Sequence, residues 1–414
     1  MINYKIIFNI LAKLILIEGI FILISAIFPV FYKEDDLLPL IYSALICFSA
    51  GGLFWFLTRN PRKDIGKREG YIIVSTVWIV FSLFGSIPFM LSGSITNFTD
   101  AFFETISGFT TTGASILNDI EALPHGILFW RSLTQWMGGM GIIVLSIAIL
   151  PMLGIGGMQL FAAEVPGLTP DKLHPKIKDT ARRLWGIYVA FTMIETVLLM
   201  FGGMNFFDAI NHSLTTMATG GYSTKQASIA FWDSQYIRYI ITLFMFLAGV
   251  NFSLSYFALK FKFDKVYKNE EFKAYIGLVL VFTFVITAVL ILIHKQNFST
   301  ALSDASFQVV SIMTTTGFIT VDYLQWVPFL GVIILFLMFI GGSAGSTGGS
   351  IKVVRIVLLL KNSYFELKRL IHPNAIIPIR LNNKTVAPQI ITNVLAFIVF
   401  YIIIFVVGVI VMSS

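Results

Sequence analysis

The chain has 414 residues, of which 57% are hydrophobic and only 12% are charged, and its mean hydropathy is +0.84. A soluble domain carries about 25% charged residues, so this composition excludes an ordinary soluble globular protein. Several apolar runs reach the roughly 20 residues needed to cross about 30 Å of hydrocarbon. The sequence therefore predicts an all-α polytopic membrane protein whose surface faces the lipid bilayer.

The formal net charge is +7, and the Lys and Arg residues are concentrated in a few segments of the chain. Five of these residues lie in each of the segments 58–70, 172–183, 260–273 and 361–384, and the loops between them are nearly free of basic residues. This alternation follows the positive-inside rule and predicts that the four segments are cytoplasmic. We therefore expect no nucleic-acid partner. Cys47 is the only cysteine, so the chain has no internal disulfide or cysteine-based metal site.

The predicted elements begin with two membrane helices, 5–30 and 37–57, joined by an acidic turn. With the basic loop that follows, they form an N-terminal hairpin domain, 1–69, that lies outside the repeats described next.

Three similar pore repeats follow the hairpin. Each is predicted to contain an outer helix, a short re-entrant helix, a Thr/Gly loop and an inner helix. In repeat 1 (70–160) these are 71–93, 97–109, 110–115 and 127–153. In repeat 2 (161–262) they are 184–203, 205–217, 217–223 and 237–259. In repeat 3 (263–370) they are 275–293, 300–313, 314–320 and the long stretch 327–360.

The last segment, 371–414, contains an apolar run at 389–412 that matches the start of a fourth repeat. By the spacing of the complete repeats, a fourth loop glycine would fall at about position 430. We therefore expect the fourth unit to be incomplete, with its pore loop and last inner helix absent from this sequence.

The Thr/Gly loops are the repeated motif of the chain. They read TTTGAS (Thr110–Ser115), MATGGYS (Met217–Ser223) and TTTGFIT (Thr314–Thr320). In each, a glycine follows an aspartate by thirteen residues, in the pairs Asp100–Gly113, Asp208–Gly221 and Asp304–Gly317. A fixed offset in successive units is typical of internal duplication.

These loops can bind a cation with their backbone. A short helix directed inward places its partly negative C-terminus near the membrane centre, and loop carbonyls can replace the water shell of an ion where glycine allows close approach. Neutral carbonyls suit K⁺, whereas Ca²⁺ or Mg²⁺ would call for carboxylates. The predicted ion-binding residues are Thr111, Thr112, Gly113, Gly220, Gly221, Thr315, Thr316 and Gly317. The alternative is that the loops are ordinary turns or small-residue packing sites.

The apolar stretch of repeat 3 is interrupted by the glycine-rich segment GGSAGSTGGS, Gly341–Ser350. A phosphate-binding loop is not expected, because the P-loop pattern is not matched and no strand precedes it. Two interpretations stay open, a glycine kink with tight packing and a mobile constriction below the loops. The candidate gating residues are Gly341, Gly342, Gly345, Gly348 and Gly349.

Several charged residues have simpler interpretations. Asp100, Asp208 and Asp304 are predicted to lie at helix starts, with Asn97 or Thr99 as the cap of the first re-entrant helix. Arg131 is predicted to anchor an inner helix at the membrane interface. Lys352 and Arg355 are expected to mark the cytoplasmic boundary after the glycine-rich segment.

Taken together, several strings resemble the Trk/Ktr/HKT superfamily of cation transporters, and the TrkH/TrkG type in particular. These are WRSLTQWMGGMGIIVLSIAILPML (130–153), the three Thr/Gly loops, GGSAGSTGGSIKVVRI (341–356) and IHPNAI (371–376). The resemblance implies four helix–pore loop–helix units around one K⁺ pathway. It also implies a homodimer in a bacterial inner membrane, with a cytosolic ring of nucleotide-binding regulatory subunits (TrkA-like).

By the same resemblance, Gly113, Gly221 and Gly317 take the filter-glycine positions, and Gly341–Gly349 takes that of an intramembrane gating loop. The chain departs from the family in lacking the fourth filter and the last inner helix. We expect a K⁺ uptake channel or transporter subunit that is not an enzyme, with K⁺ as the transported ion and no cofactor. The alternatives are a truncated, non-conducting subunit or a symporter of other monovalent cations (Na⁺/K⁺).

Overall fold

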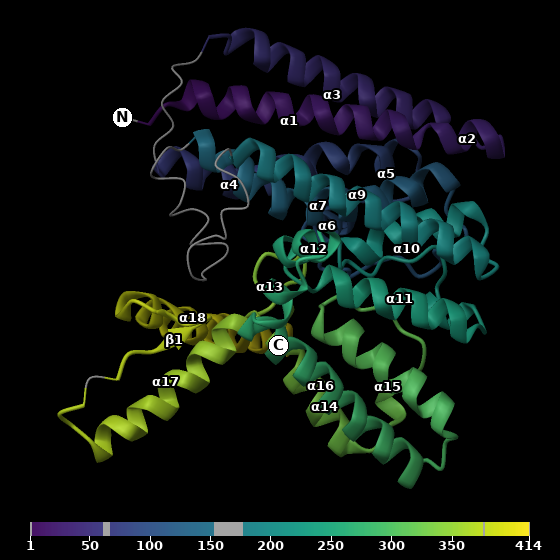
Figure 1. The fold of residues 1–414 in the computed structure, drawn as a ribbon. Coiled ribbons are helices and arrows are strands. Elements are labelled where there is room, and N and C mark those ends of the chain that lie inside the picture. The colour runs from purple at the N-terminus through teal and green to yellow at the C-terminus, as the bar shows by residue number, and fades with distance from the viewer. Residues whose placement is uncertain (1, 61–66, 153–176, 376, 414) are drawn as a thin grey trace.

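The computed structural model describes residues 2–60, 67–152, 177–375 and 377–413. The described part is built almost entirely of helices (Figure 1). Six of them are long and apolar enough to cross a membrane, and a bent helix pair would make a seventh. This confirms the predicted all-α polytopic membrane protein.

The N-terminal hairpin consists of α1 (Tyr4–Ser25), α2 (Ile27–Tyr32) and α3 (Leu37–Leu57). Helices α1 and α3 lie side by side along one edge of the molecule (Figure 1). Their bounds agree with the predicted pair within a few residues. Asn3 begins α1, because its side-chain oxygen accepts a hydrogen bond from the backbone N–H of Ile6 at 3.3 Å.

Repeat 1 follows the predicted order of elements. Its helices are α4 (Lys67–Gly85), α5 (Ile87–Leu91), α6 (Phe98–Phe109) and α7 (His125–Met152). The re-entrant helix α6 is capped by Asn97, whose side chain accepts from the backbone N–H of Thr99 at 2.9 Å. Asn97 is therefore the cap, and Thr99 is not.

Repeat 2 differs from the prediction in its inner helix. Its elements are α9 (Ile177–Phe201), α10 (Phe206–Met217), the 3₁₀ turn η2 (Ser228–Phe231), α11 (Gln235–Ala248) and α12 (Phe252–Leu259), followed by α13 (Phe263–Tyr267). The predicted continuous helix 237–259 is wrong, because α11 and α12 meet at 109°. The break lies at Gly249–Asn251, where the backbone bonds to the glycine-rich segment of repeat 3.

Repeat 3 contains the predicted break in its inner helix. Its elements are α14 (Glu270–Leu292), α15 (Phe298–Met313), η3 (Tyr323–Gln325), α16 (Pro328–Ile340) and α17 (Val353–Ile371). A small antiparallel hairpin then pairs β1 (Arg380–Leu381) with β2 (Lys384–Thr385), before α18 (Pro388–Ser413). In Figure 1, α17 and α18 extend away from the three repeats on one side of the molecule.

The short helices α10 and α15 lie largely inside the protein, whereas α6 is buried along only part of its surface. Every residue of α10 except the first is buried, whereas only 6% of the most apolar window of α18 is buried. The inner helices connect neighbouring repeats, because α7 packs against both α6 and α10, and α11 packs against both α10 and α15. Irregular backbone at membrane depth is tolerated only where protein surrounds it or it lines a cavity, and this packing provides such surroundings.

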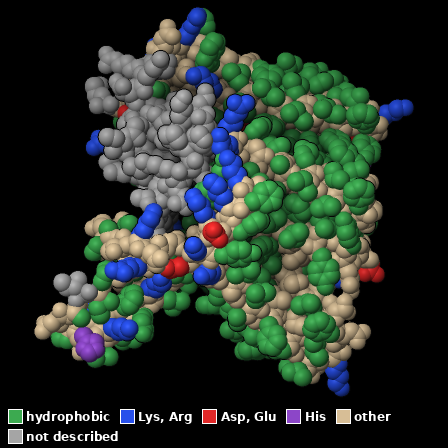
Figure 2. All heavy atoms as spheres, in the orientation of Figure 1, with side chains coloured by type: hydrophobic (Ala, Val, Ile, Leu, Met, Phe, Trp, Pro, Cys, Tyr) green, Lys and Arg blue, Asp and Glu red, His purple; other side chains and the backbone are tan. Residues whose placement is uncertain are grey.

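Hydrophobic and basic side chains occupy different parts of the surface. The face drawn in Figure 2 is covered mainly by hydrophobic side chains, and Lys and Arg gather in a band over the region of α12 and α13. Lys260, Lys262, Lys265 and Lys268 all lie in or beside these two short helices. The band fits the predicted cytoplasmic segment 260–273.

Candidate functional site

The three Thr/Gly loops share one unusual backbone conformation. In each, a threonine with positive φ stands two residues before a glycine with positive φ. The pairs are Thr111 (54°) with Gly113 (77°), Thr219 (53°) with Gly221 (79°), and Thr315 (62°) with Gly317 (83°). A non-glycine residue with positive φ is uncommon, so three copies at equivalent positions indicate one conserved architecture within the chain. Ordinary turns would not repeat this pattern.

Each loop also leaves its re-entrant helix in the same way. The backbone N–H of the residue before the glycine donates to a carbonyl five residues earlier, at 2.9 Å in all three loops. The bonds run from Thr112 to Ser107, from Gly220 to Thr215 and from Thr316 to Ser311. The loop is thereby held against the last turn of the helix, whose C-terminal dipole end favours a cation.

The loops stand next to one another in chain order. We number the Thr/Gly loops by repeat: loop 1 (Thr110–Ser115), loop 2 (Met217–Ser223) and loop 3 (Thr314–Thr320). A β-carbon on Gly113 would lie 2.2 Å from the carbonyl oxygen of Gly220, in loop 2. A β-carbon on Gly221 would lie 1.9 Å from the carbonyl oxygen of Thr316, in loop 3. Only glycine fits at these contacts, because such distances are far below van der Waals separation. At Gly317 nothing described lies within 4 Å of the β-carbon position.

A hollow of about 220 Å³ borders loop 3. Its lining includes Gln308, Ser311, Thr315 and Gly317. Among the described residues, no group of three or more His, Cys, Asp or Glu could hold a metal ion. The polar side chains of this lining include the amide of Gln308 and the hydroxyls of Ser311 and Thr315.

One position of each short helix supports the loop that follows it, nine residues before the loop glycine with positive φ. In repeat 1 it is Glu104, whose carboxylate accepts from the backbone N–H of Ile116 at 3.1 Å. In repeat 2 it is His212, whose Nε2 lies 2.9 Å from Ser223 Oγ. In repeat 3, Gln308 Nε2 donates to the Val321 carbonyl at 3.4 Å. The Thr/Gly motif does not include this position, and the signal that marks it is its constant offset of nine residues from the loop glycine.

Gln135 of the inner helix α7 supports loop 2 from the neighbouring repeat. Its Nε2 donates to the Gly220 carbonyl at 2.8 Å, and its Oε1 accepts from the backbone N–H of Tyr222 at 3.0 Å. Gln135 is fully buried. Its amide thus fixes the backbone on both sides of Gly221.

The three repeated aspartates do not share one role. Asp100 and Asp208 lie in the first turns of α6 and α10, as predicted. Asp304 lies well inside α15, which begins at Phe298, so the prediction of a helix-start residue is wrong there. Its Oδ1 instead lies 3.5 Å from Nη1 of Arg238, on α11. Asp304 lies six residues after the start of α15, whereas Asp100 and Asp208 lie two residues after the starts of α6 and α10.

One prediction for a basic residue is also wrong. Arg131 is no interfacial anchor, because the residue is only 2% exposed and its Nε lies 2.6 Å from Glu104 Oε1. Arg355, which was predicted to mark the cytoplasmic boundary, is buried with its guanidinium 3.6 Å from the ring centre of Phe397. Lys352 turns back into the glycine-rich segment, where its Nζ donates to the carbonyl of Gly348.

The glycine-rich segment contacts the end of α10, where loop 2 begins, and also contacts loop 3. Thr347 Oγ1 donates to the carbonyl of Met217, the last residue of α10, at 3.0 Å. The backbone N–H of Gly349 donates to Thr315 Oγ1 at 2.7 Å. Of the five candidate gating glycines, Gly341, Gly342 and Gly348 are buried, Gly345 is half-buried and Gly349 is exposed.

The same segment is bonded to the break between α11 and α12 and to the start of α14. The backbone N–H of Ser343 donates to the Gly249 carbonyl at 2.8 Å, and that of Phe252 donates to the Gly345 carbonyl at 3.2 Å. The carboxylate of Glu271, at the start of α14, accepts from the backbone N–H of Ala344 at 2.6 Å. Loop 3, the break between α11 and α12 and the outer helix α14 therefore meet at the glycine-rich segment.

The fold defines a helical polytopic membrane protein, and its three Thr/Gly loops contact one another in chain order. A family model described as "TrkH: Cation transport protein" matches residues 40–414. The chain belongs to this TrkH family.

Individual relatives agree with that assignment. The chain is 42% identical over 412 residues to the Trk system potassium uptake protein TrkH of Escherichia coli strain K12, covering 98% of this chain and 85% of the relative. It is 34% identical over 378 residues to TrkG of the same organism, covering 90% and 77%. The crystal structure of the potassium transporter TrkH from Vibrio parahaemolyticus matches with a TM-score of 0.89 at 36% identity, over 98% of this chain and 85% of that one.

Proposed function

We propose that the protein transports K⁺ across a bacterial inner membrane, as a subunit of an uptake channel or transporter. The observation that carries this proposal is the shared left-handed Thr-x-Gly backbone of three loops that contact one another in order. Such loops present rows of carbonyl oxygens that can replace the water shell of a K⁺ ion. The names of the relatives, which are potassium uptake proteins, support the choice of ion.

In this proposal the ion-binding atoms come from Thr111, Thr112, Gly113, Gly220, Gly221, Thr315, Thr316 and Gly317. The glycine-rich segment is the gate, because it lies below loops 2 and 3 and its own bonds cross to Thr315 and Met217. Moving this segment would change the space below the loops without unfolding a helix.

The partners are also part of the proposal. We infer a homodimer and a cytosolic nucleotide-binding regulatory subunit that contacts the basic side of the protein. The band of Lys and Arg in Figure 2 supports an acidic or membrane-proximal partner on that side. The chemistry of transport involves no catalytic residue and no resident cofactor, so the transported ion is the ligand.

The test is Rb⁺ uptake by the full-length gene product in cells that lack their own K⁺ transport. We expect saturable uptake that K⁺ competes for and Na⁺ does not. Absence of uptake despite normal abundance in the membrane would contradict transport and favour a non-conducting subunit. Equal competition by Na⁺ would favour the alternative of a Na⁺/K⁺ symporter.

A further inference from the structure

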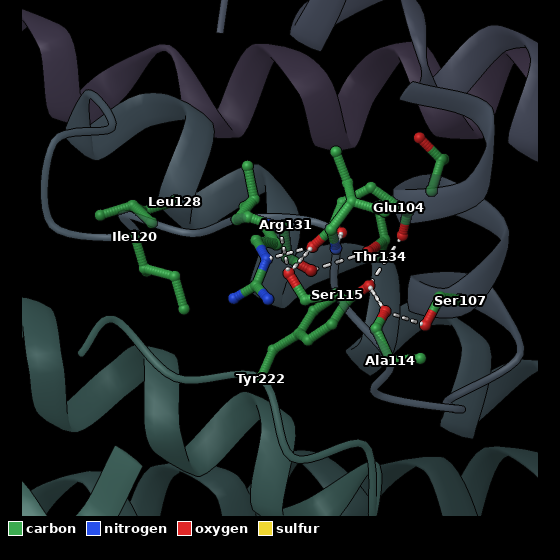
Figure 3. Close-up of polar contacts among 12 residues, drawn as sticks. Glu104, Ser107, Ala114, Ser115, Ile120, Leu128, Arg131, Thr134 and Tyr222 are labelled. Atoms are coloured by element: carbon green, nitrogen blue, oxygen red, sulfur yellow. Dashed lines mark hydrogen bonds and ion pairs between the residues drawn. The ribbon is translucent and has the colours of Figure 1, made fainter. Parts of the chain in front are cut away.

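A buried ion pair joins the supports of loops 1 and 2. Arg131 on α7 and Glu104 on α6 are 2% and 1% exposed, and Arg131 Nε donates to Glu104 Oε1 at 2.6 Å. Figure 3 shows the two side chains directed toward each other between the re-entrant helix and the filter loops. A charge pair inside a membrane protein is costly to bury and is kept where it has a role.

The arginine reaches across to loop 2. Its Nη1 donates to the carbonyl of Ser223 at 3.0 Å, and its guanidinium lies 3.5 Å from the ring centre of Tyr222. Both contacts fall within two residues of the filter glycine Gly221. One side chain of repeat 1 therefore sets the path of the chain in repeat 2.

The glutamate holds loop 1. Besides Arg131, its carboxylate accepts from Ser115 Oγ at 3.0 Å and from the backbone N–H of Ile116 at 3.1 Å. The hydroxyl of Tyr222 donates to the Glu104 backbone carbonyl at 2.8 Å, and it also lies 3.3 Å from the carbonyl of Ala114 (Figure 3). Loop 1 and loop 2 are thus linked through a single network of bonded groups.

The equivalent positions in the other repeats form more local hydrogen bonds. His212 bonds to Ser223 of its own loop and to the Asp208 carbonyl of its own helix, and its ring centre lies 5.7 Å from that of Phe318 in loop 3. Gln308 donates to the Val321 carbonyl, one residue after its own loop. Arg238 of α11, near the position equivalent to Arg131, lies against Asp304 of the next re-entrant helix at 3.5 Å. Among the described residues, repeat 1 alone places a guanidinium on the loop of its neighbour.

We propose that Arg131 and Glu104 are positioning residues that hold loops 1 and 2 at a fixed separation, and so determine the preference for K⁺ over Na⁺. The carbonyl of Gly220 faces Gly113 closely, so a small relative shift of the two loops changes the ion–carbonyl distances there. Because the pair is neutral as a whole, it adds no net charge beside the ion path. This inference rests on the proposed function of the loops as a filter.

The experiment compares Arg131→Lys and Glu104→Gln with the wild-type protein, measuring Rb⁺ uptake and its inhibition by Na⁺. Lysine keeps the positive charge but cannot bond Glu104 and Ser223 together, because it lacks the planar fork of arginine. We expect each variant to lower the K⁺ over Na⁺ preference by about tenfold, the effect of losing one charge-assisted hydrogen bond. Arg238→Lys is the matched control and should keep the preference.

A double variant separates positioning from charge balance. Glu104→Gln with Arg131→Gln restores neutrality without restoring the bonds to both loops. If the pair positions the loops, the double variant stays unselective; recovery of selectivity would overturn the inference. Membrane abundance and the melting temperature in detergent identify variants that fail to fold, and the conservative Arg131→Lys then carries the test. A wild-type protein without K⁺ uptake would reject the proposed function, whereas unchanged selectivity in all variants would reject only this inference.

Discussion

A β-carbon on Gly221 would stand 1.9 Å from the carbonyl oxygen of Thr316, so two residues 95 positions apart leave room for nothing but hydrogen between them. The corresponding contact joins Gly113 to the Gly220 carbonyl. Gly113 and Gly221 therefore require glycine for two separate reasons, positive φ and close approach.

Gly221→Ala should abolish uptake and destabilise the protein. The methyl group would displace the Thr316 carbonyl, and alanine disfavours the left-handed backbone, at a combined cost of about 2–4 kcal/mol. Gly203→Ala is the control, because Gly203 also has positive φ (95°) but nothing within 4 Å of its β-carbon position. We expect the control to retain uptake with a small loss of stability. Normal uptake by Gly221→Ala would contradict the contact.

Gln135→Leu should destabilise loop 2. The substitution leaves the Gly220 carbonyl and the Tyr222 N–H buried without a partner, which costs about 1–3 kcal/mol each. The measurement is the melting temperature in detergent with increasing K⁺, which we expect to stabilise the wild-type protein more than the variant. Gln389→Leu, at an exposed position of α18, serves as the control. An unchanged K⁺-dependent shift in Gln135→Leu would argue against this support.

Thr347→Val should loosen the gate. Its hydroxyl donates to the Met217 carbonyl at 3.0 Å, with the Ala248 carbonyl at 3.3 Å, and valine keeps the shape but not the donor. Losing about 1 kcal/mol from the closed arrangement corresponds to roughly a fivefold rise in basal uptake. Thr347→Ser keeps the hydroxyl and should behave like the wild-type protein. A fall in uptake at normal abundance would mean that the bond stabilises the conducting state instead.

Asp36→Asn should stabilise the protein at neutral pH. Burial, followed by the nearby charge of Glu34, raises the pKa of Asp36, which lies in the turn before α3, above its ordinary value of 3.8. The folded protein therefore binds this proton more tightly than the unfolded chain does, so its stability falls as pH rises from the ordinary pKa through the raised one. Asparagine removes this slope while its side-chain oxygen can still accept from the Ile127 N–H.

Melting temperatures between pH 4 and pH 7 would measure the effect, with the exposed Asp35→Asn as the control. A variant whose stability still falls over this range as steeply as that of the wild-type protein would show that Asp36 is not the titrating group.

The local architecture was predictable because it is encoded in consecutive residues. Apolar runs of spanning length marked the helices, and the Thr/Gly strings marked the loops whose φ angles prove to be left-handed in all three copies. The predicted ends of the three short helices agree with the structure within two residues. Asn97, which was proposed as a cap, stands at the start of α6, and the structure adds Asn205 and Asn297 at the starts of α10 and α15. Because the chain contains three similar repeats, the same pattern of helix and loop could be predicted at three places.

Only the tertiary structure determines which groups form hydrogen bonds and ion pairs with the buried polar side chains. Arg131 bonds to a carboxylate 27 residues earlier and to a carbonyl 92 residues later, and nothing near it in the sequence distinguishes it from a residue at the interface. The bend at Gly249–Asn251 likewise depends on hydrogen bonds to a segment almost a hundred residues away. Backbone conformation depends mainly on residues that are close in the sequence. The burial of a charged side chain or of a backbone carbonyl depends instead on which distant residues the packed helices place next to it.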